Sequence, residues 1–155
     1  MRRLLIPVLI FAIGEALAQR PFVGGSTSGV LILSNQPTRF ELNLTLGAKE
    51  FRGPVDVRGS VLFGLRGGNQ GGVDFGITAD GFYSFGSGEV SPYAGLGVGF
   101  NQLGTGLPDF HLLLGGEYMV HPRFGLYAEL MPALLFGFGV TDYFVQFRFG
   151  SNIYL

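Results

Sequence analysis

The chain of 155 residues contains no cysteine, no tryptophan and only two histidines, and charged residues make up 14% of it. The lack of cysteine excludes a disulfide framework, a thiolate metal site and a lipoprotein anchor. The 10 basic and 11 acidic residues leave no basic surplus that would indicate a nucleic-acid partner. The hydrophobic content of 47% is too high for a disordered chain, and the 27 glycines follow no collagen-like period.

Residues 1–18 have the pattern of a signal peptide. Arg2 and Arg3 are followed by the apolar stretch Leu4 to Ile13 and by the small-residue cleavage site Ala16-Leu17-Ala18. This stretch is shorter than the roughly 20 residues of a membrane-spanning helix, which disfavours the alternative of a retained N-terminal anchor. We therefore expect export, cleavage near Ala18, and a single domain over residues 19–155.

Apolar and polar residues alternate with a period of two along most of this domain, as in a β-strand with one apolar face. Between Val55 and Leu65, for example, Asp56, Arg58 and Ser60 interrupt the apolar positions. Turn-forming Gly, Pro, Asn and Ser separate the segments, and Gln102 belongs to one such turn, where an added arginine should be tolerated. Gly24 to Gly29 is weakly patterned, which allows a late start or a bulge in the first strand. The strands are expected over residues 21–33, 38–50, 54–66, 72–86, 90–101, 109–120, 123–136 and 142–155.

Charged side chains avoid the apolar faces of these segments. Arg20, Glu50, Arg52, Glu89, Asp109 and Asp142 fall at segment ends or turns. The other charges share the polar face, and one Arg or Lys facing the lipid midplane would cost about 2–4 kcal/mol. These polar-face charges are Arg39, Lys49, Arg58, Arg66, Arg123 and Arg148, with Glu41, Asp56, Asp74, Asp80, Glu117 and Glu129.

Together these patterns predict an all-β protein: an eight-stranded antiparallel up-and-down transmembrane β-barrel. An even number of strands closes the sheet and returns both ends to one side. Outward aromatics should form two interfacial rings, whereas a soluble two-sheet sandwich with these aromatics in its core is the alternative. One ring comprises Phe40, Phe63, Phe75, Phe100, Phe110, Phe136 and Tyr143, and the other Tyr83, Phe85, Tyr118 and Phe124.

An eight-stranded barrel is only wide enough for side chains to fill its interior, so the charges inside must pair. Small inward residues, Ser91, Gly95, Gly97 and Gly99 with Gly115 and Gly125 on the next strands, should leave room for them. We therefore predict a plugged interior without a wide pore. The expected ion-pair network comprises Arg39, Glu41, Lys49, Asp56, Arg58, Asp74, Asp80, Glu117, Glu129 and Arg148.

Three stretches resemble a known family. These are the glycine-rich segment Pro92 to Phe100, the strand–tight turn–strand segment Gly115 to Glu129, and the C-terminal strand from Phe147 to Leu155. They are similar to the small eight-stranded outer-membrane barrels of the outer-membrane protein A and X type. The resemblance implies an outer-membrane location, contact with membrane lipids and lipopolysaccharide, and recognition of the last strand by the barrel-insertion machinery.

The sequence shows no catalytic, cofactor or metal motif. His111 is expected to be a polar residue of the interior or the rim, and Ser60, Ser84 and Ser91 show no Ser-His-acid spacing. The leading hypothesis is a structural or interaction protein of the outer membrane without enzyme activity. A narrow channel or transporter of small hydrophobic molecules is the second hypothesis, and a lipid-modifying enzyme is the third.

Overall fold

A computed structural model describes residues 20–32, 39–66, 72–86, 88–102, 106–137 and 140–155. The expected signal peptide, the expected turns within residues 33–38 and 67–71, residues 87, 103–105 and 138–139 of other turns, and the side chain of Arg66 lie outside this part. Every observed strand boundary is within two residues of the expected one. The strands are β1 (Arg20–Ile32), β2 (Arg39–Arg52), β3 (Val55–Arg66), β4 (Gly72–Ser84), β5 (Val90–Phe100), β6 (Pro108–His121), β7 (Phe124–Gly137) and β8 (Val140–Tyr154).

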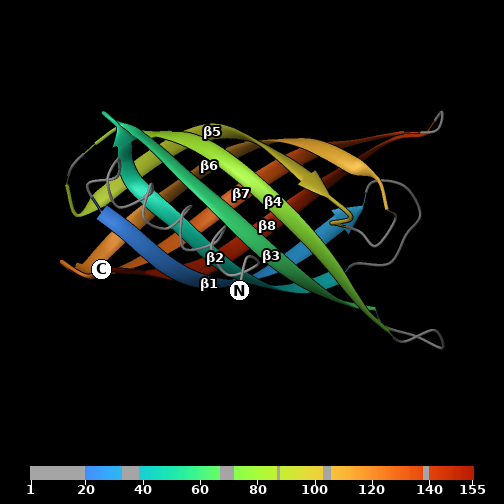
Figure 1. Ribbon diagram of the computed structural model, residues 1–155, viewed down its shortest axis with the longest axis horizontal. Coiled ribbons are helices and arrows are strands. Elements are labelled where there is room, and N and C mark those ends of the chain that lie inside the picture. Colours follow the sequence, from blue (N-terminus) through green and yellow to red (C-terminus); the bar gives the residue numbers. More distant parts are fainter. Residues whose placement is uncertain (1–19, 33–38, 67–71, 87, 103–105, 138–139) are drawn as a thin grey trace, which may run out of the picture.

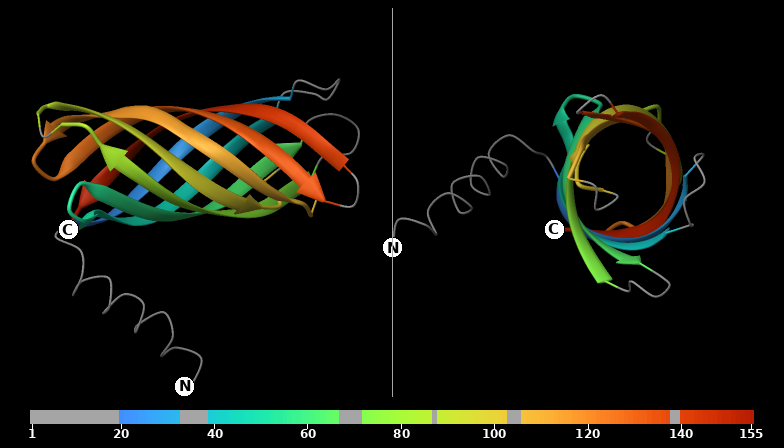
Figure 2. Two further views of the ribbon diagram at one scale, coloured as in Figure 1. Left: turned by 90° about the horizontal axis from the view of Figure 1, so that it is seen from above. Right: turned by 90° about the vertical axis from the view of Figure 1, so that its right-hand side faces the viewer.

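The eight strands form one closed antiparallel barrel in chain order (Figure 1). Closure comes from β1 and β8, which pair from Phe22 with Tyr154 to Ile32 with Phe144. Seen along its axis, the barrel is a continuous ring (Figure 2). β1 begins and β8 ends at the same end, here called the terminus end, and the opposite end is called the loop end. The predicted fold class is confirmed.

No helix in the described part of the chain is long and apolar enough to cross a membrane.

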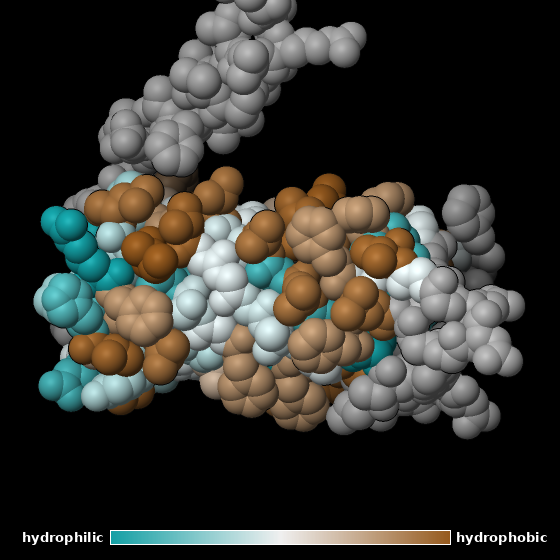
Figure 3. All heavy atoms as spheres, turned by 90° about the horizontal axis from the view of Figure 1, so that it is seen from below, coloured by the Kyte–Doolittle hydropathy of each residue, from teal (hydrophilic) through white to brown (hydrophobic). Residues whose placement is uncertain are grey.

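Side chains alternate between the two faces of every strand, and the buried face is the polar one. In β4, Thr78 and Asp80 are buried, whereas Phe75 and Ile77 are 59% and 57% exposed. Figure 3 shows one face of the barrel with hydrophobic side chains spread along the wall. This distribution is the reverse of a water-soluble domain, where large exposed apolar surfaces are avoided. The closed ring and this reversal exclude the two-sheet sandwich.

Tight turns connect strands at the terminus end. His121 pairs with Phe124, so Pro122 and Arg123 form a two-residue hairpin loop, and a register shift precedes it between Met119 and His121. Arg123 is exposed in this turn. The expectation that Arg123 lies on the inner polar face is therefore wrong, because the turn ends the alternation of the strand.

The first strand is complete. β1 starts at Arg20 and pairs continuously with β2 from Arg20 with Lys49 to Val30 with Arg39, so the expected late start or bulge is absent from it. Its inward residues Gly24, Ser26 and Ser28 are small and pack against the polar side chains of Asn43 and Asn152 inside.

Aromatic side chains lie on the outer wall near both rims. Near the terminus end, Tyr83 and Phe85 are exposed, with ring centroids 5.2 Å apart. Phe63 is only half-buried and contacts the exposed Phe75 edge-on near the loop end. Such rings are typical of the two membrane interfaces of a barrel. The other exposed aromatics of the loop end are Phe40, Phe100, Phe110, Phe136 and Tyr143.

Candidate functional site in the barrel interior

The centre of the interior is an ion-pair cluster built around Arg58 of β3. Its Nε donates to Asp80 Oδ2 at 2.6 Å, and its two terminal nitrogens donate to the two oxygens of Glu129. The three side chains are nearly inaccessible to solvent. Asp80 is on β4 and Glu129 on β7, so the cluster ties strands across the barrel. A bidentate guanidinium–carboxylate pair is among the strongest hydrogen-bonded arrangements in proteins.

Arg148 of β8 adds a second buried cation to this cluster. Its Nη1 lies 3.5 Å from Glu129 Oε2 and 3.8 Å from Asp80 Oδ2, so the contact is an ion pair longer than a good hydrogen bond. The hydroxyl of Tyr93 donates to Glu129 Oε1 at 2.6 Å. Glu129 therefore has two cations and a hydroxyl donor around it, which compensates its loss of hydration.

His111 continues the cluster toward the loop end. Its Nε2 lies 2.8 Å from Asp80 Oδ1 and its Nδ1 lies 2.8 Å from Asp109 Oδ1. A ring that donates from both nitrogens satisfies both carboxylates, and that form carries a positive charge. His111 is fully buried, as expected of a polar interior residue.

Gln102 occupies the inside of the barrel rather than an exposed loop. It is 1% exposed, and its Nε2 donates to Asp109 Oδ1 at 2.6 Å. The preceding Asn101 has a φ of 58° and turns the chain at the end of β5. The expectation that Gln102 tolerates arginine is therefore wrong.

A second group of polar residues lies near the loop end. Arg39 is 3.0 Å from Asp74 and 3.4 Å from Glu41. The amide of Gln146 donates to Glu41 Oε2 at 2.6 Å and to Ser28 at 2.8 Å. These contacts join β1, β2, β4 and β8.

A third group lies near the terminus end. Lys49 Nζ is 2.8 Å from Glu117 Oε2, and the Tyr154 hydroxyl also donates to Glu117. Asp56 accepts from the Ser84 hydroxyl and from the Glu50 backbone N–H, both at 2.6 Å. Glu117 thus bonds across the barrel rather than to His111, with which it shares a strand.

The charges inside are not evenly balanced. In the described part of the chain, four basic side chains face the interior against seven carboxylates, and His111 can add a fifth positive charge. The imbalance arises because Arg123 lies outside and Asp109 lies inside. Asp109 is expected at a segment end, but it is buried in the interior, as its shared parity with His111 indicates. The basic residues are Arg39, Lys49, Arg58 and Arg148, and the seven carboxylates are Glu41, Asp56, Asp74, Asp80, Asp109, Glu117 and Glu129.

Glycines make room for the charged groups. A Cβ on Gly64 would overlap the guanidinium of Arg39, and one on Gly125 would overlap the carboxylate of Glu117. Gly115 lies in the same way against Tyr93 and Glu129. These positions need glycine because a side chain stands opposite and not because the backbone requires it.

Gly97 gives a sharp test of this packing. A Cβ there would overlap both His111 and Asp80, whereas a Cβ on Gly81, which faces outward, meets nothing within 4 Å. We expect Gly97→Ala to destabilise the barrel by about 1–3 kcal/mol, the usual cost of overpacking. Gly81→Ala should leave the urea midpoint of unfolding nearly unchanged. Equal midpoints for the two variants would contradict the packing of His111 against β5.

Apolar residues also occupy the interior, which the sequence analysis did not identify. Phe82, Tyr93, Leu113 and Met131 form one buried cluster. A second cluster, near the loop end, contains Val30, Ala133, Leu135 and Phe144. Their parity with inward residues of the same strands is the signal in the sequence that places them inside, as for Phe82 with Asp80 and Leu113 with His111.

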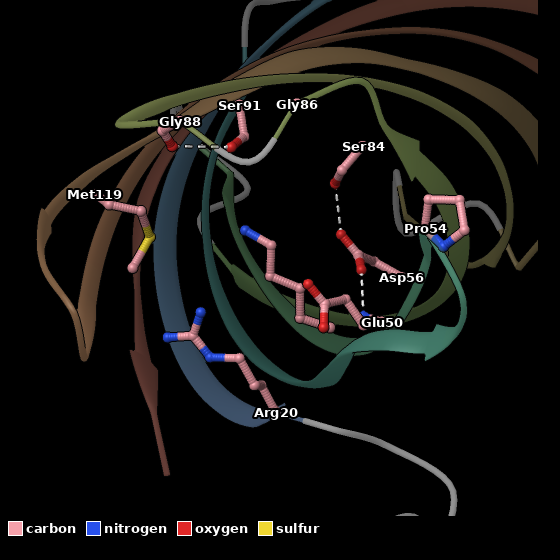
Figure 4. Close-up of a pocket in the computed structure, with 10 residues that line it drawn as sticks. Arg20, Glu50, Pro54, Asp56, Ser84, Gly86, Gly88, Ser91 and Met119 are labelled. Carbon is pink, nitrogen blue, oxygen red and sulfur yellow. Dashed lines mark hydrogen bonds between the residues drawn. The ribbon is translucent and has the colours of Figure 1, made fainter.

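The interior opens at the terminus end into a polar cavity of about 340 Å³. Figure 4 shows Arg20, Asp56 and Ser84 among the residues that line it. Deeper, between Arg58, Phe82 and Tyr154, a second space measures only about 10 Å³. A space of this size holds about one water molecule, so the cavity narrows sharply toward the centre.

Among the described residues, none of the hydroxyls of Ser60, Ser84 and Ser91 bonds to His111, and that of Ser84 donates to Asp56. The Ser60 hydroxyl is 3.1 Å from that of Thr45, and Ser91 donates to the Gly88 carbonyl, so neither bonds to His111. Within the described residues, no group of three or more His, Asp or Glu side chains is placed to hold a metal ion.

Comparison with known proteins gives a likeness of fold. No protein-family model matches the chain, and no curated protein matches it. Among solved structures, Neisserial surface protein A is similar with a TM-score of 0.66 and 12% identity, covering 86% of this chain and 95% of that chain. The attachment invasion locus protein of Yersinia pestis, in a phospholipid bilayer nanodisc, has a TM-score of 0.54 and 16% identity, covering 88% and 99%.

The N-terminal β-barrel domain of Pseudomonas aeruginosa OprF is also similar, with a TM-score of 0.51 and 15% identity, covering 85% of this chain and 97% of that chain. The chain therefore has the fold of the small eight-stranded outer-membrane β-barrels, as its sequence indicated. At these identities the likeness concerns the fold alone, and one such fold carries many functions.

Proposed function

We propose that this chain is a structural or interaction protein of the outer membrane, without catalytic activity. One observation carries the proposal: the barrel wall exposes Leu, Val, Ile and Phe, while Arg58, Asp80, Glu129 and Arg148 are buried inside it. A wall of this kind is stable against hydrocarbon and not against water. The buried ion pairs then link β2, β3, β4, β6, β7 and β8 from within.

Export and insertion follow from the same proposal. Residues 1–18 act as the signal peptide, and cleavage occurs near Ala18. The N-terminus and the C-terminus of the mature barrel, which lie at its terminus end, both remain in the periplasm. Membrane lipids and lipopolysaccharide contact the wall, and the insertion machinery recognises β8. The neighbour solved in a phospholipid nanodisc supports the lipid contact, since it shares the fold.

Fractionation of a Gram-negative host that expresses the full chain tests the proposal. We expect the protein in the outer-membrane fraction, with the mass of a chain that begins at Gln19. After extraction in mild detergent, the unheated sample should migrate faster on a gel than the heated sample, because the closed barrel stays folded until it is heated. Recovery as a water-soluble monomer without detergent would refute the proposal.

A narrow cation channel is the second candidate, favoured by the surplus of interior carboxylates and by the polar cavity at the terminus end. The constriction beside Arg58 argues for a small conductance. In planar bilayers we expect the purified protein to show no large, stable conductance steps. Porin-sized steps would show that the interior opens, and the structural proposal would then be wrong.

A lipid-modifying role has little support from the geometry. His111 is enclosed between Asp80 and Asp109 in the interior, so its ring is not presented at the rim where a lipid ester would lie.

A further inference from the structure

An apolar groove of about 350 Å³ crosses the outer wall at β6, β7 and β8, near the loop end. Its volume is in the range of small-molecule sites, which is about 300–1,000 Å³. None of the side chains that line it is charged. They include Phe110, Leu112, Pro132, Leu134, Tyr143 and Val145.

Pro132 explains why the wall is hollowed here. β6 and β7 pair at His111–Ala133 and again at Leu114–Leu130, and the ladder is interrupted between these pairs. Proline has no N–H to donate to a neighbouring strand. On its other side Pro132 still pairs with Val145 of β8. The short proline ring therefore lies in a row of longer side chains, at a point where two strands are not bonded.

The wall behind the groove is also apolar. Ala133 and Phe144 line the groove, and they belong to the buried cluster with Val30 and Leu135. Their side chains face the interior, so the floor of the groove is strand backbone. No charged side chain lines this floor.

We infer that this groove seats one acyl chain of a membrane lipid. The inference rests on the proposed insertion of the barrel in a membrane. Lipid chains are as apolar as the wall, so the gain comes from dispersion contacts, which a concave surface makes on several sides of the chain. Tyr143 at the mouth is 58% exposed, and a tyrosine at a rim places its hydroxyl at headgroup level.

Single-tryptophan variants test the inference, because the natural chain has no tryptophan. Phe110→Trp places the reporter at the groove, and Phe75→Trp places a matched reporter on the outer face of β4, near the same rim. Both full-length variants are reconstituted in unbrominated phosphatidylcholine vesicles and titrated with dibromostearic acid, which quenches tryptophan on contact. Val145→Phe is added to each variant to fill the groove. If the proteins with Val145→Phe do not assemble, Leu134→Phe replaces it.

We expect Phe110→Trp to reach half-maximal quenching at a concentration of the acid about threefold lower than Phe75→Trp, equivalent to about 0.7 kcal/mol. Val145→Phe should remove this difference and leave the Phe75→Trp curve unchanged. Superimposable curves for the two reporters would overturn the inference. If neither reporter is quenched in vesicles made wholly of brominated phosphatidylcholine, the barrel is not in the membrane, and the proposed function itself fails.

Discussion

Replacing Leu96 by arginine is expected to prevent the barrel from assembling in a membrane. Leu96 is an outward residue in the middle of β5, and 53% of it is exposed on the wall. An arginine facing hydrocarbon at that depth costs roughly 2–4 kcal/mol, a large part of the stability of a small domain. The measurement is the fraction of protein that folds into vesicles from urea, read from heat-modifiable gel migration.

Glu89→Arg is the matched control for this substitution. Glu89 is exposed in the connection between β4 and β5 at the terminus end, so the new charge stays in water. Gln102 cannot serve as the control, because its side chain is buried against Asp109. If Leu96→Arg and Glu89→Arg fold equally well, the outer wall does not face lipid.

Replacing Arg58 by alanine is expected to destabilise the barrel by about 3–5 kcal/mol. The substitution leaves Asp80 and Glu129 buried without the cation that bonds to both. Equilibrium unfolding in urea, with the protein in vesicles, measures the change. The exposed Arg123 gives the control, since Arg123→Ala should change stability by less than about 0.5 kcal/mol.

A second substitution separates this ion pair from general packing. Adding Glu129→Gln to Arg58→Ala removes one of the two carboxylates that have lost Arg58 as a partner. It should therefore lower the free energy of unfolding by less than Glu129→Gln does in the natural protein. Additive effects would show that Arg58 and Glu129 do not interact, because independent sites add.

The alternation of residues was enough to predict eight strands and the lipid-facing side of each. A period of two is a local property, and a one-residue slip would place Asp56 and Arg58 in lipid, so the register is strongly constrained. Two of the assignments that fail concern the ends of strands. Arg123 is expected on the polar face of the segment 123–136, although a tight turn precedes the strand there. Gln102 does lie in a turn, but it is buried because the chain turns inward after Asn101, which conflicts with the expected tolerance of arginine.

The partners inside the barrel could not be predicted from the sequence. Arg58 and Glu129 are 71 positions apart and meet only because the strands tilt around a closed ring. Phe82 and Phe144 also face the interior, where each belongs to a buried apolar cluster. Parity gives the face of a residue, whereas the tilt and stagger of the barrel determine what it contacts.

Spin labels along β4 test the central claim most directly, because the chain has no cysteine and each introduced cysteine is a unique labelling site. In bilayers, labels at Ile77 and Ala79 should collide with oxygen, which dissolves in hydrocarbon, and not with a water-soluble nickel complex. Labels at Thr78 and Phe82 should collide with neither, because these side chains are buried. Contact of the Ile77 and Ala79 labels with the nickel complex would contradict a lipid-facing wall.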